Sequence, residues 1–380
     1  MCGKSEPVGF CSIIPSDILR HIAENGTDEE RENAFQALTA SSRIRGQRQV
    51  LNNIAMVAMT ATGTKRRTVY DAKHLSTLPG VLVRSEGSVA GADKSVNEAY
   101  DGAGKTYDFF MTVLNRNSID DRGLRLDSTV HYRSGFNNAF WNGQQMVYGD
   151  GDGIIFNRFT KSLDVIGHEL GHGITQYEAD LNYEDQSGAL NEHFSDVFGS
   201  LVLQYANNQT AASASWLIGE GLFAPGINGK ALRSMKAPGT AYNDAKIGKD
   251  PQPAHMKNYV NTSDDNGGVH INSGIPNKAF YEFAKSLGGN SWSRAGRVWY
   301  TTLCNELSSN ATFQDCANKT YKVAKDLYGA AVAAKAKAAW KKVGLNVQLT
   351  GFAASSAKSQ AATKSPLPKK KSASKKSGGK

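Results

Sequence analysis

The chemistry of this chain is most visible in the run from His168 to His172, which reads His-Glu-Leu-Gly-His. The two histidines are four residues apart, so on a helix both imidazoles lie on one face and can bind one metal ion. Glu169 follows the first histidine, where a carboxylate can accept a proton from a water molecule that the metal activates. Apolar neighbours predict a helix over 163–177. So short a run also fits two ordinary helical histidines that bind no metal. The surrounding sequence therefore has to decide between these two interpretations.

A candidate third ligand lies in a second predicted helix, over 188–206. Catalytic zinc usually takes three protein ligands and keeps one position open for water. Glu192 is a carboxylate of the required type, and Asp196 lies one turn further on the same helical face. A carboxylate at Asp196 can accept the second ring N–H of a ligating histidine and fix its tautomer. The alternative is an exposed helix face with two acids.

Longer motifs accompany these residues in a fixed order. They are Tyr70-Asp71, Leu82 to Glu86, Asn137 to Asn142, Met146 to Gly153, Asn191 to Asp196, Leu232 to Met235 and Asp265 to Gly274. With the histidine run they resemble the thermolysin-like neutral metalloproteases over roughly residues 65 to 345. The resemblance implies an α+β fold with a β-rich N-terminal lobe, a mostly helical C-terminal lobe and the zinc helix at the cleft between them.

The resemblance also implies a role for each matching position. One catalytic Zn²⁺ would be held by His168, His172 and Glu192. Glu169 would be the general base. His270 and Tyr183 would stabilise the oxyanion, and Asp265 would keep His270 protonated because a nearby carboxylate raises the pKa of a histidine. Outside these motifs, a lone histidine or tyrosine is more often structural.

Other matching positions would bind the substrate. Asn138 and Ala139 match the edge to which an extended peptide adds as a strand. Arg233 matches the residue that contacts a substrate carbonyl. The pocket for the residue after the scissile bond would be lined by Phe156, Val165, Ile218 and Leu232. Because all four are apolar, we expect cleavage on the N-terminal side of large hydrophobic residues; the alternative is ordinary core packing.

Residues 1–50 resemble the short propeptide of the protealysin-like branch, including the stretch from Cys11 to Pro15. One helix is predicted to start at that proline, and Thr27 to Glu30 has the pattern of a capping box that opens the next. The implied product is a zymogen whose propeptide inhibits it intramolecularly and is cut around residues 45–60. The Cys11 thiolate is either a zinc ligand that holds the enzyme latent or a packing residue.

The rest of the chain divides by pattern and charge. We expect a propeptide over 1–50, a β-rich lobe with the zinc helix over 51–180, a helical lobe over 181–350 and a disordered tail over 351–380. Further helices are predicted over 272–287, 291–307, 312–327 and 330–343. Of the net charge of +9, the tail contributes eight charges, because it contains eight lysines and no acidic residue. The tail either contacts anionic surfaces or is simply solvated.

Length and composition limit the partners. No apolar run is long enough for a membrane span, and the N-terminus lacks the apolar segment of a secretory leader. The resemblance to this family would then suggest that the protein is secreted or released from the cell by a non-classical route. We expect a monomer that acts on peptide or protein substrates. Cys304 and Cys316 flank a predicted helix-to-helix turn and either pair or remain buried thiols.

Calcium binding, which is typical of thermolysins, is doubtful here. Acids stand at two matching positions, Asp164 and Glu220, but leucine or serine replaces them at Leu203, Ser215 and Leu217. Calcium takes about six to eight oxygen ligands, and leucine supplies no side-chain oxygen.

Two rival functions remain. One is a catalytically silent peptide-binding protein of the same fold, and the other is a nucleic-acid-associated protein led by its lysine-rich tail.

Overall fold

The structure is a computed structural model that describes residues 12–40 and 64–348. Cys11, the expected processing region around 45–60 and the tail over 351–380 lie outside the described residues. By its internal contacts the chain divides into Met1–Val347 and Gln348–Lys380, and the fold described below is that of the first unit. Within the described part, no helix has the length and apolar character needed to cross a membrane.

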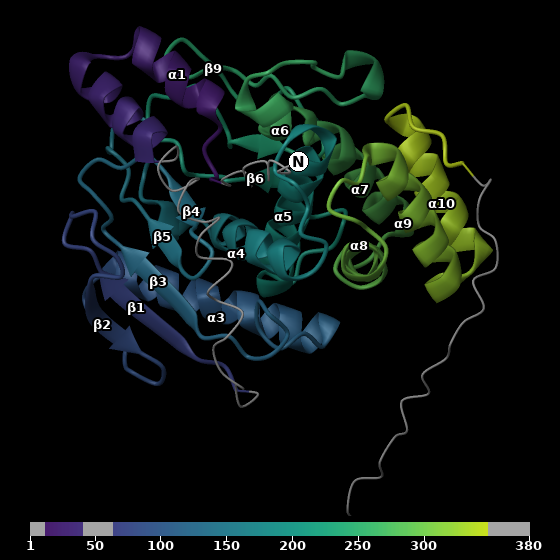
Figure 1. Ribbon diagram of the computed structural model, residues 1–380, viewed down its shortest axis with the longest axis horizontal. Coiled ribbons are helices and arrows are strands. Elements are labelled where there is room, and N and C mark those ends of the chain that lie inside the picture. Colours follow the sequence, from purple (N-terminus) through teal and green to yellow (C-terminus); the bar gives the residue numbers. More distant parts are fainter. Residues whose placement is uncertain (1–11, 41–63, 349–380) are drawn as a thin grey trace, which may run out of the picture. The chain divides into compact units, whose positions relative to one another are not determined.

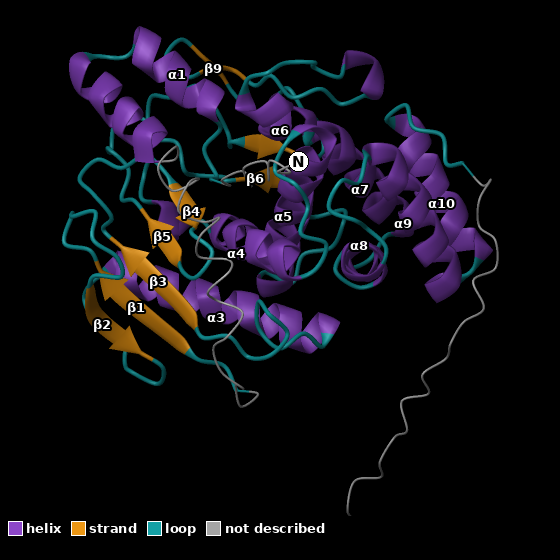
Figure 2. Ribbon diagram, viewed as in Figure 1, coloured by secondary structure: helices purple, strands orange, loops and turns teal. Residues whose placement is uncertain are grey.

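A five-stranded sheet is the centre of the N-terminal lobe (Figures 1 and 2). Its strands are β1 (Arg67–Asp71), β2 (Val81–Ser85), β3 (Leu126–Val130), β4 (Ala139–Trp141) and β5 (Met146–Tyr148). In the order β2-β1-β3-β5-β4, the three central strands run parallel and each outer strand is antiparallel to its neighbour. The carboxyl ends of β1, β3 and β5 therefore meet at one edge, and β4 is an outer strand of the sheet.

One long helix in this lobe, α3 (Lys94–Leu114), was not predicted from the sequence. It packs against β1, β3 and the zinc-motif helix α4. Its N-cap is Asp93, whose side chain accepts a hydrogen bond from the Val96 N–H at 3.1 Å. The segment is rich in glycine and tyrosine, which favour turns and strands. A Cβ on Gly102 would lie 2.3 Å from Ile166 Cδ1, so this glycine makes room for α4.

The C-terminal lobe is mainly helical, as expected. Helix α4 (Leu163–Tyr177) carries the zinc motif, and the helices of the C-terminal lobe follow it: α5 (Asp185–Ala206), α6 (Asp265–Asn272), α7 (Gly274–Leu287), α8 (Arg294–Asn305), α9 (Phe313–Tyr328) and α10 (Ala330–Lys342). Short elements complete it: β6 (Leu217–Ile218), β7 (Arg233–Ser234), β8 (Asn243–Asp244), β9 (Gly248–Lys249), and the 3-10 turns η1 (Phe159–Lys161) and η2 (Met256–Asn258). The prediction for α4 was correct to the residue, whereas α5 begins three residues before its predicted start.

Helices α4 and α5 lie in close contact near the centre of Figure 1. A Cβ on Gly199 would lie 2.3 Å from the Asp164 carbonyl oxygen, and one on Gly171 would lie 3.1 Å from Ser195 Cα. Side chains at these glycines would push the two helices apart. Their absence brings the histidine face of α4 against the acidic face of α5.

The described part of the predicted propeptide forms α1 (Ser16–Asn25) and a second helix that is described over 28–40. The predicted capping box is confirmed: Thr27 N–H donates to Glu30 Oε2 at 2.7 Å, and Glu30 N–H donates to Thr27 Oγ1 at 3.4 Å. Glu30 also pairs with Lys246 at 2.5 Å, which ties this unit to the β8–β9 turn.

The two cysteines of the helical lobe remain free thiols, so the predicted alternative of a disulfide between them is wrong. Cys316 is fully buried on α9, and Cys304 is partly buried on α8. Burial raises the pKa of the Cys304 thiol to about 12, which keeps it protonated and unreactive.

Candidate active site

Three predicted metal ligands meet between α4 and α5. His168, His172 and Glu192 are all fully buried. The two Nε2 atoms lie 3.0 Å apart, Glu192 Oε2 lies 3.5 Å from His168 Nε2, and Glu192 Oε1 lies 3.5 Å from His172 Nε2. A tetrahedral zinc ion with bonds of about 2.1 Å separates its ligand atoms by about 3.4 Å. The three side chains are therefore spaced to share one such ion.

The outer hydrogen bonds of the two imidazoles support the same conclusion. His168 Nδ1 lies 2.8 Å from Asp196 Oδ1, and His172 Nδ1 lies 2.8 Å from Asn191 Oδ1. With Nδ1–H as donor, each Nε2 lone pair faces the space between the ligands. Glu192 Oε2 is buried and has no hydrogen-bond partner within the described residues. A buried anionic oxygen without a donor fits a bound cation.

Asp196 connects this group to the opposite side of the cleft. Its carboxylate accepts two hydrogen bonds from the buried Arg233 guanidinium, at 2.9 and 2.8 Å, and one from Asn277 Nδ2 at 2.8 Å. Burial alone would raise the pKa of Asp196, but the charges of Arg233 and His168 outweigh it and hold that pKa well below its usual range. Asp196 is therefore an anion that fixes both His168 and Arg233. Asn277 was not among the residues predicted from the sequence.

Glu169 lies fully buried next to the histidines on α4. One of its oxygens, Oε2, accepts a hydrogen bond from the Trp141 N–H at 3.0 Å. Trp141 ends the edge strand β4, so the candidate base is held between the three metal ligands and the strand edge. Sequence reasoning quoted Trp141 only as part of a motif and gave it no role.

The predicted oxyanion residues approach from the other side. His270 Nδ1 lies 2.7 Å from Asp265 Oδ1, and the His270 N–H donates to Asp265 Oδ2 at 2.8 Å. Burial would lower the pKa of His270, but Asp265 and Glu192 raise it to about 10. The Tyr183 hydroxyl lies 3.3 Å from His270 Nε2 and donates to Glu192 Oε1. Two proton donors thus lie side by side next to a candidate metal ligand.

The backbone before His270 has an unusual conformation. Asp265 and Asn266 both have positive φ, 54° and 52°, and two glycines in the same conformation follow them. Non-glycine residues rarely adopt this region, and such residues cluster at functional sites. Here the turn directs the Asp265 carboxylate back at the His270 ring.

A segment of the predicted propeptide lies in the cleft and contacts four of the predicted groups. The Ile13 N–H donates to the Ala139 carbonyl at 3.2 Å, and the Ile14 N–H donates to Asn138 Oδ1 at 3.1 Å. Arg233 Nη1 donates to the Ile13 carbonyl at 3.2 Å. His270 Nε2 lies 3.0 Å from the Ser12 carbonyl oxygen. All four contacts involve the backbone of Ser12–Ile14, and two of them are made with Asn138 and Ala139, where β4 begins.

The four residues of the predicted apolar pocket belong to the buried core of the described chain. Each of the four has at most 1 % of its surface exposed: Phe156, Val165, Ile218 and Leu232. Ile218 on β6 pairs with Arg233 on β7, so the pocket wall and the guanidinium that binds Ile13 are on adjoining strands. Ile13 is itself fully buried and belongs to the same apolar cluster. The structure thus gathers the predicted site residues around one cleft.

Comparison with known proteins agrees with this geometry. Residues 38–176 match the family model for the thermolysin metallopeptidase catalytic domain, and residues 179–345 match its alpha-helical domain. The chain belongs to the thermolysin family of metallopeptidases. It is 52% identical over 348 residues to an extracellular metalloprotease of Pectobacterium carotovorum subsp. carotovorum, covering 91% of this chain and 99% of that protein.

Other members of the thermolysin family match this chain over different shares of their own length. A bacillolysin of Bacillus cereus is 38% identical over 360 residues, which cover 88% of this chain but 60% of that protein. Among solved structures, the precursor of protealysin, a metalloproteinase from Serratia proteamaculans, is 52% identical with a TM-score of 0.82. That match covers 88% of this chain and 99% of the other.

Membership in the thermolysin family confirms several predictions. The chain is a zinc-dependent metalloendopeptidase of the two-lobed α+β fold, and its likeness to the protealysin precursor supports a zymogen. The cluster of His168, His172 and Glu192 is consistent with that zinc ion. The catalytically silent alternative receives no support from these relatives.

Proposed function

We propose that this protein is a zymogen of an endopeptidase that cleaves on the N-terminal side of large hydrophobic residues. The observation that carries the proposal is the placement of Ser12–Ile14, whose backbone occupies the four groups expected to bind a substrate. If this segment is taken as a stand-in for a substrate, Ile13 corresponds to the residue after the scissile bond, and the Ser12 carbonyl corresponds to the carbonyl that is attacked.

The proposed roles follow from this placement. A zinc ion held by His168, His172 and Glu192 would lower the pKa of a bound water and polarise the scissile carbonyl. Glu169, fixed by the Trp141 N–H, accepts the proton of the attacking water and passes it to the leaving amine. His270, kept protonated by Asp265, donates to the developing oxyanion, and Tyr183 donates beside it. One such donor typically contributes about 3 kcal/mol to transition-state stabilisation.

Substrate affinity would come mainly from the backbone. Ala139 and Asn138 receive the amides of an added strand, and Arg233 donates to the carbonyl of the residue after the cleaved bond. Asn138 Nδ2 is buried with no hydrogen-bond partner within the described residues, so it can donate to a further substrate carbonyl. The apolar pocket then selects a large hydrophobic side chain, as the buried Ile13 illustrates.

The same contacts make the propeptide an intramolecular inhibitor. A segment that holds the substrate-binding groups excludes external peptides until it is released. Because a relative at 52% identity is named an extracellular metalloprotease, we infer that this enzyme also acts outside the cell. A monomeric state and contacts of the lysine-rich tail with anionic surfaces belong to the same proposal.

We further infer that the paired calcium site of the family is not retained. Asp164 Oδ1 accepts from Ser162 Oγ at 2.6 Å and from the Val165 N–H at 3.0 Å, while Oδ2 accepts from the Gly219 N–H at 2.7 Å. Its oxygens thus already have protein donors. Glu220 is exposed, and Leu203 and Leu217 offer no side-chain oxygen.

Casein hydrolysis by the purified full chain tests the function. Glu169→Ala is expected to reduce cleavage by at least about 100-fold while its zinc content stays at that of the parent. Glu184→Gln removes an exposed acid and serves as the matched control, with unchanged activity. Sequencing of the products should place large hydrophobic residues directly after the cut. Unchanged cleavage by Glu169→Ala, or cuts before charged residues, would contradict the proposal.

A further inference from the structure

A second group of possible metal ligands lies at the edge where the three parallel strands end. His74 follows β1, His131 directly follows β3, and Asp150 follows β5. Because these strands are parallel neighbours, their carboxyl ends converge, and such edges are common ligand sites in sheets. The His74 N–H donates to the His131 carbonyl at 2.9 Å, which locks the two turns together. The imidazole centroids are 5.4 Å apart.

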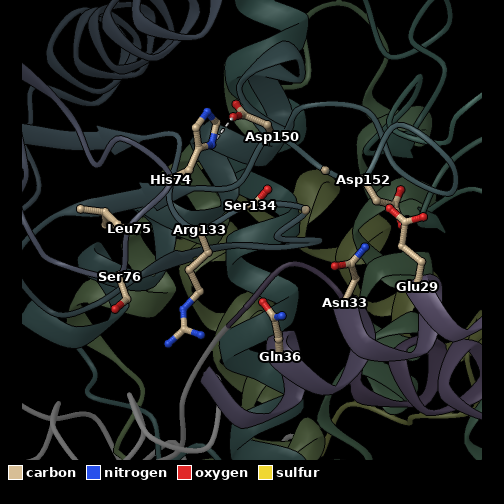
Figure 3. A pocket seen from close by; sticks show the side chains of 12 residues that line it. Glu29, Asn33, Gln36, His74, Leu75, Ser76, Arg133, Ser134, Asp150 and Asp152 are labelled. Atoms are coloured by element: carbon tan, nitrogen blue, oxygen red, sulfur yellow. Dashed lines mark ion pairs between the residues drawn. The ribbon is translucent and has the colours of Figure 1, made fainter.

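The donor atoms of these three side chains point to one place. His131 Nδ1 lies 2.7 Å from Asp150 Oδ2, and His74 Nδ1 lies 3.8 Å from the same oxygen. Figure 3 shows His74 and Asp150 directed at each other at the rim of a cavity of about 730 Å³. These distances lie on either side of the spacing of about 3.4 Å between ligands in a tetrahedral zinc site. Two imidazoles and one carboxylate also form the donor set of the catalytic cluster.

Asp93 orients the central histidine. Its Oδ2 lies 2.8 Å from His131 Nε2, so that nitrogen carries a hydrogen and donates to the carboxylate. Nδ1 is then the atom that faces Asp150 and His74. An imidazole with one nitrogen on a carboxylate and the other toward a metal is the usual arrangement in metal sites. His168 has the same arrangement with Asp196 in the catalytic cluster.

The backbone of both turns is held in a sparsely populated conformation. Lys73, His74, His131 and Arg133 all have φ between 54° and 58°. None of them is glycine, and left-handed backbone at such residues is often associated with function. The Arg133 N–H donates to the Leu75 carbonyl at 3.1 Å and stabilises this geometry. Both turns that present the histidines thus contain left-handed backbone at non-glycine residues.

We propose that His74, His131 and Asp150 form a second divalent metal site, of the zinc type and separate from the catalytic ion. Imidazole nitrogens favour Zn²⁺ or Co²⁺ over Ca²⁺ and Mg²⁺, which prefer oxygen ligands. The His74 side chain is 59% exposed at the cavity rim, so an ion has access from solvent.

The competing occupant is a proton. Hydrogen bonding to Asp150 and Asp93, against the effect of burial, raises the pKa of His131 to about 9 in the metal-free protein. Binding of an ion at Nδ1 releases that proton to solvent. A structural imidazolium bridging two carboxylates is therefore the alternative that an experiment must separate from a metal site.

The number of metal ions bound per chain distinguishes a second metal site from a bridging imidazolium. All chains carry Glu169→Ala to prevent self-cleavage, and Cys2→Ser and Cys11→Ser so that thiols outside the described residues bind no zinc. After dialysis against buffered Zn²⁺, mass spectrometry should find two ions per parent chain. His74→Asn should retain one, because asparagine tolerates the left-handed turn but lacks the imidazole. His255→Asn, a partly exposed histidine elsewhere, should retain two.

Co²⁺ gives an independent measurement. The parent chain should show visible absorption from two four-coordinate ions, and His74→Asn should lose about half of it while its circular dichroism stays unchanged. A single ion bound by the parent chain would overturn the proposal and leave the bridging imidazolium as the answer. Two ions in His74→Asn would overturn it as well, because the second ion would then lie elsewhere.

Discussion

Asp17, on the first helix of the propeptide, is predicted to make the zymogen less stable as the pH rises. Burial of its carboxyl, together with repulsion from Asp265, raises its pKa from the usual 3.8 to about 6, although His270 acts in the opposite direction. Tyr242 is the other titratable group that it faces. Asp17 Oδ1 has no hydrogen-bond partner within the described residues, and hydrogen bonds from the backbone of Asp17 and Ile18 offset only part of the rise in pKa.

The direction of the effect follows from linkage. An acid whose pKa is higher in the folded than in the unfolded chain destabilises the fold once it ionises. The penalty is absent below about pH 4, grows between about pH 4 and 6, and is complete above about pH 6. A rise of about two in pKa corresponds to about 3 kcal/mol at most. Because Asp17 keeps partial solvent contact, we expect about half of that.

Asp17→Asn tests this reasoning because it removes the charge and keeps the shape. Urea unfolding of the full chain carrying Glu169→Ala should show the variant more stable than its parent, by an amount that grows by about 1 kcal/mol between about pH 4 and 8. Glu24→Gln removes an exposed acid from the same helix and should give no such trend. A difference that stays constant with pH, or shrinks as pH rises, would refute the argument.

Other outcomes follow from the same structure. His270→Ala should lower kcat/KM of the mature enzyme by about 100-fold with its zinc content unchanged, because one oxyanion donor is lost; a loss of zinc would count against that role. Ile13→Asp should speed maturation, followed by gel electrophoresis, because a carboxylate cannot be buried in an apolar pocket at low cost. Millimolar Ca²⁺ should raise the melting temperature by less than about 2 °C, since Asp164 already has protein donors; a strong rise would restore the calcium site.

The sequence predicted the zinc cluster well because its elements are local. His168, Glu169 and His172 lie within two turns of α4, and Glu192 and Asp196 lie one turn apart on α5. Helical periodicity fixes such relations without knowledge of the fold. The longer motifs then supplied the positions that lie far away in the chain, which periodicity alone could not have brought together.

Features that depend on tertiary contacts were missed. In helix α3, Gly102 allows the close approach of α4, whereas the sequence shows only that glycine weakens helices. Asn277 reaches Asp196 from another helix, 81 residues further along the chain. His74, His131 and Asp150 have no telling spacing, because the order of the parallel strands, and not a local pattern, brings them together.

Arg233 explains why backbone recognition and metal binding occur at the same place. Its planar guanidinium donates through Nε and Nη2 to Asp196 and through Nη1 to the Ile13 carbonyl. Asp196 in turn holds the ring of His168. A lysine carries the same charge but cannot present donors in this fixed fork. The group that binds the Ile13 carbonyl is therefore positioned by the same carboxylate that orients a candidate metal ligand. In the proposed substrate complex, a bound chain would be aligned with the metal cluster through its backbone, and its side chains would determine specificity in the apolar pocket.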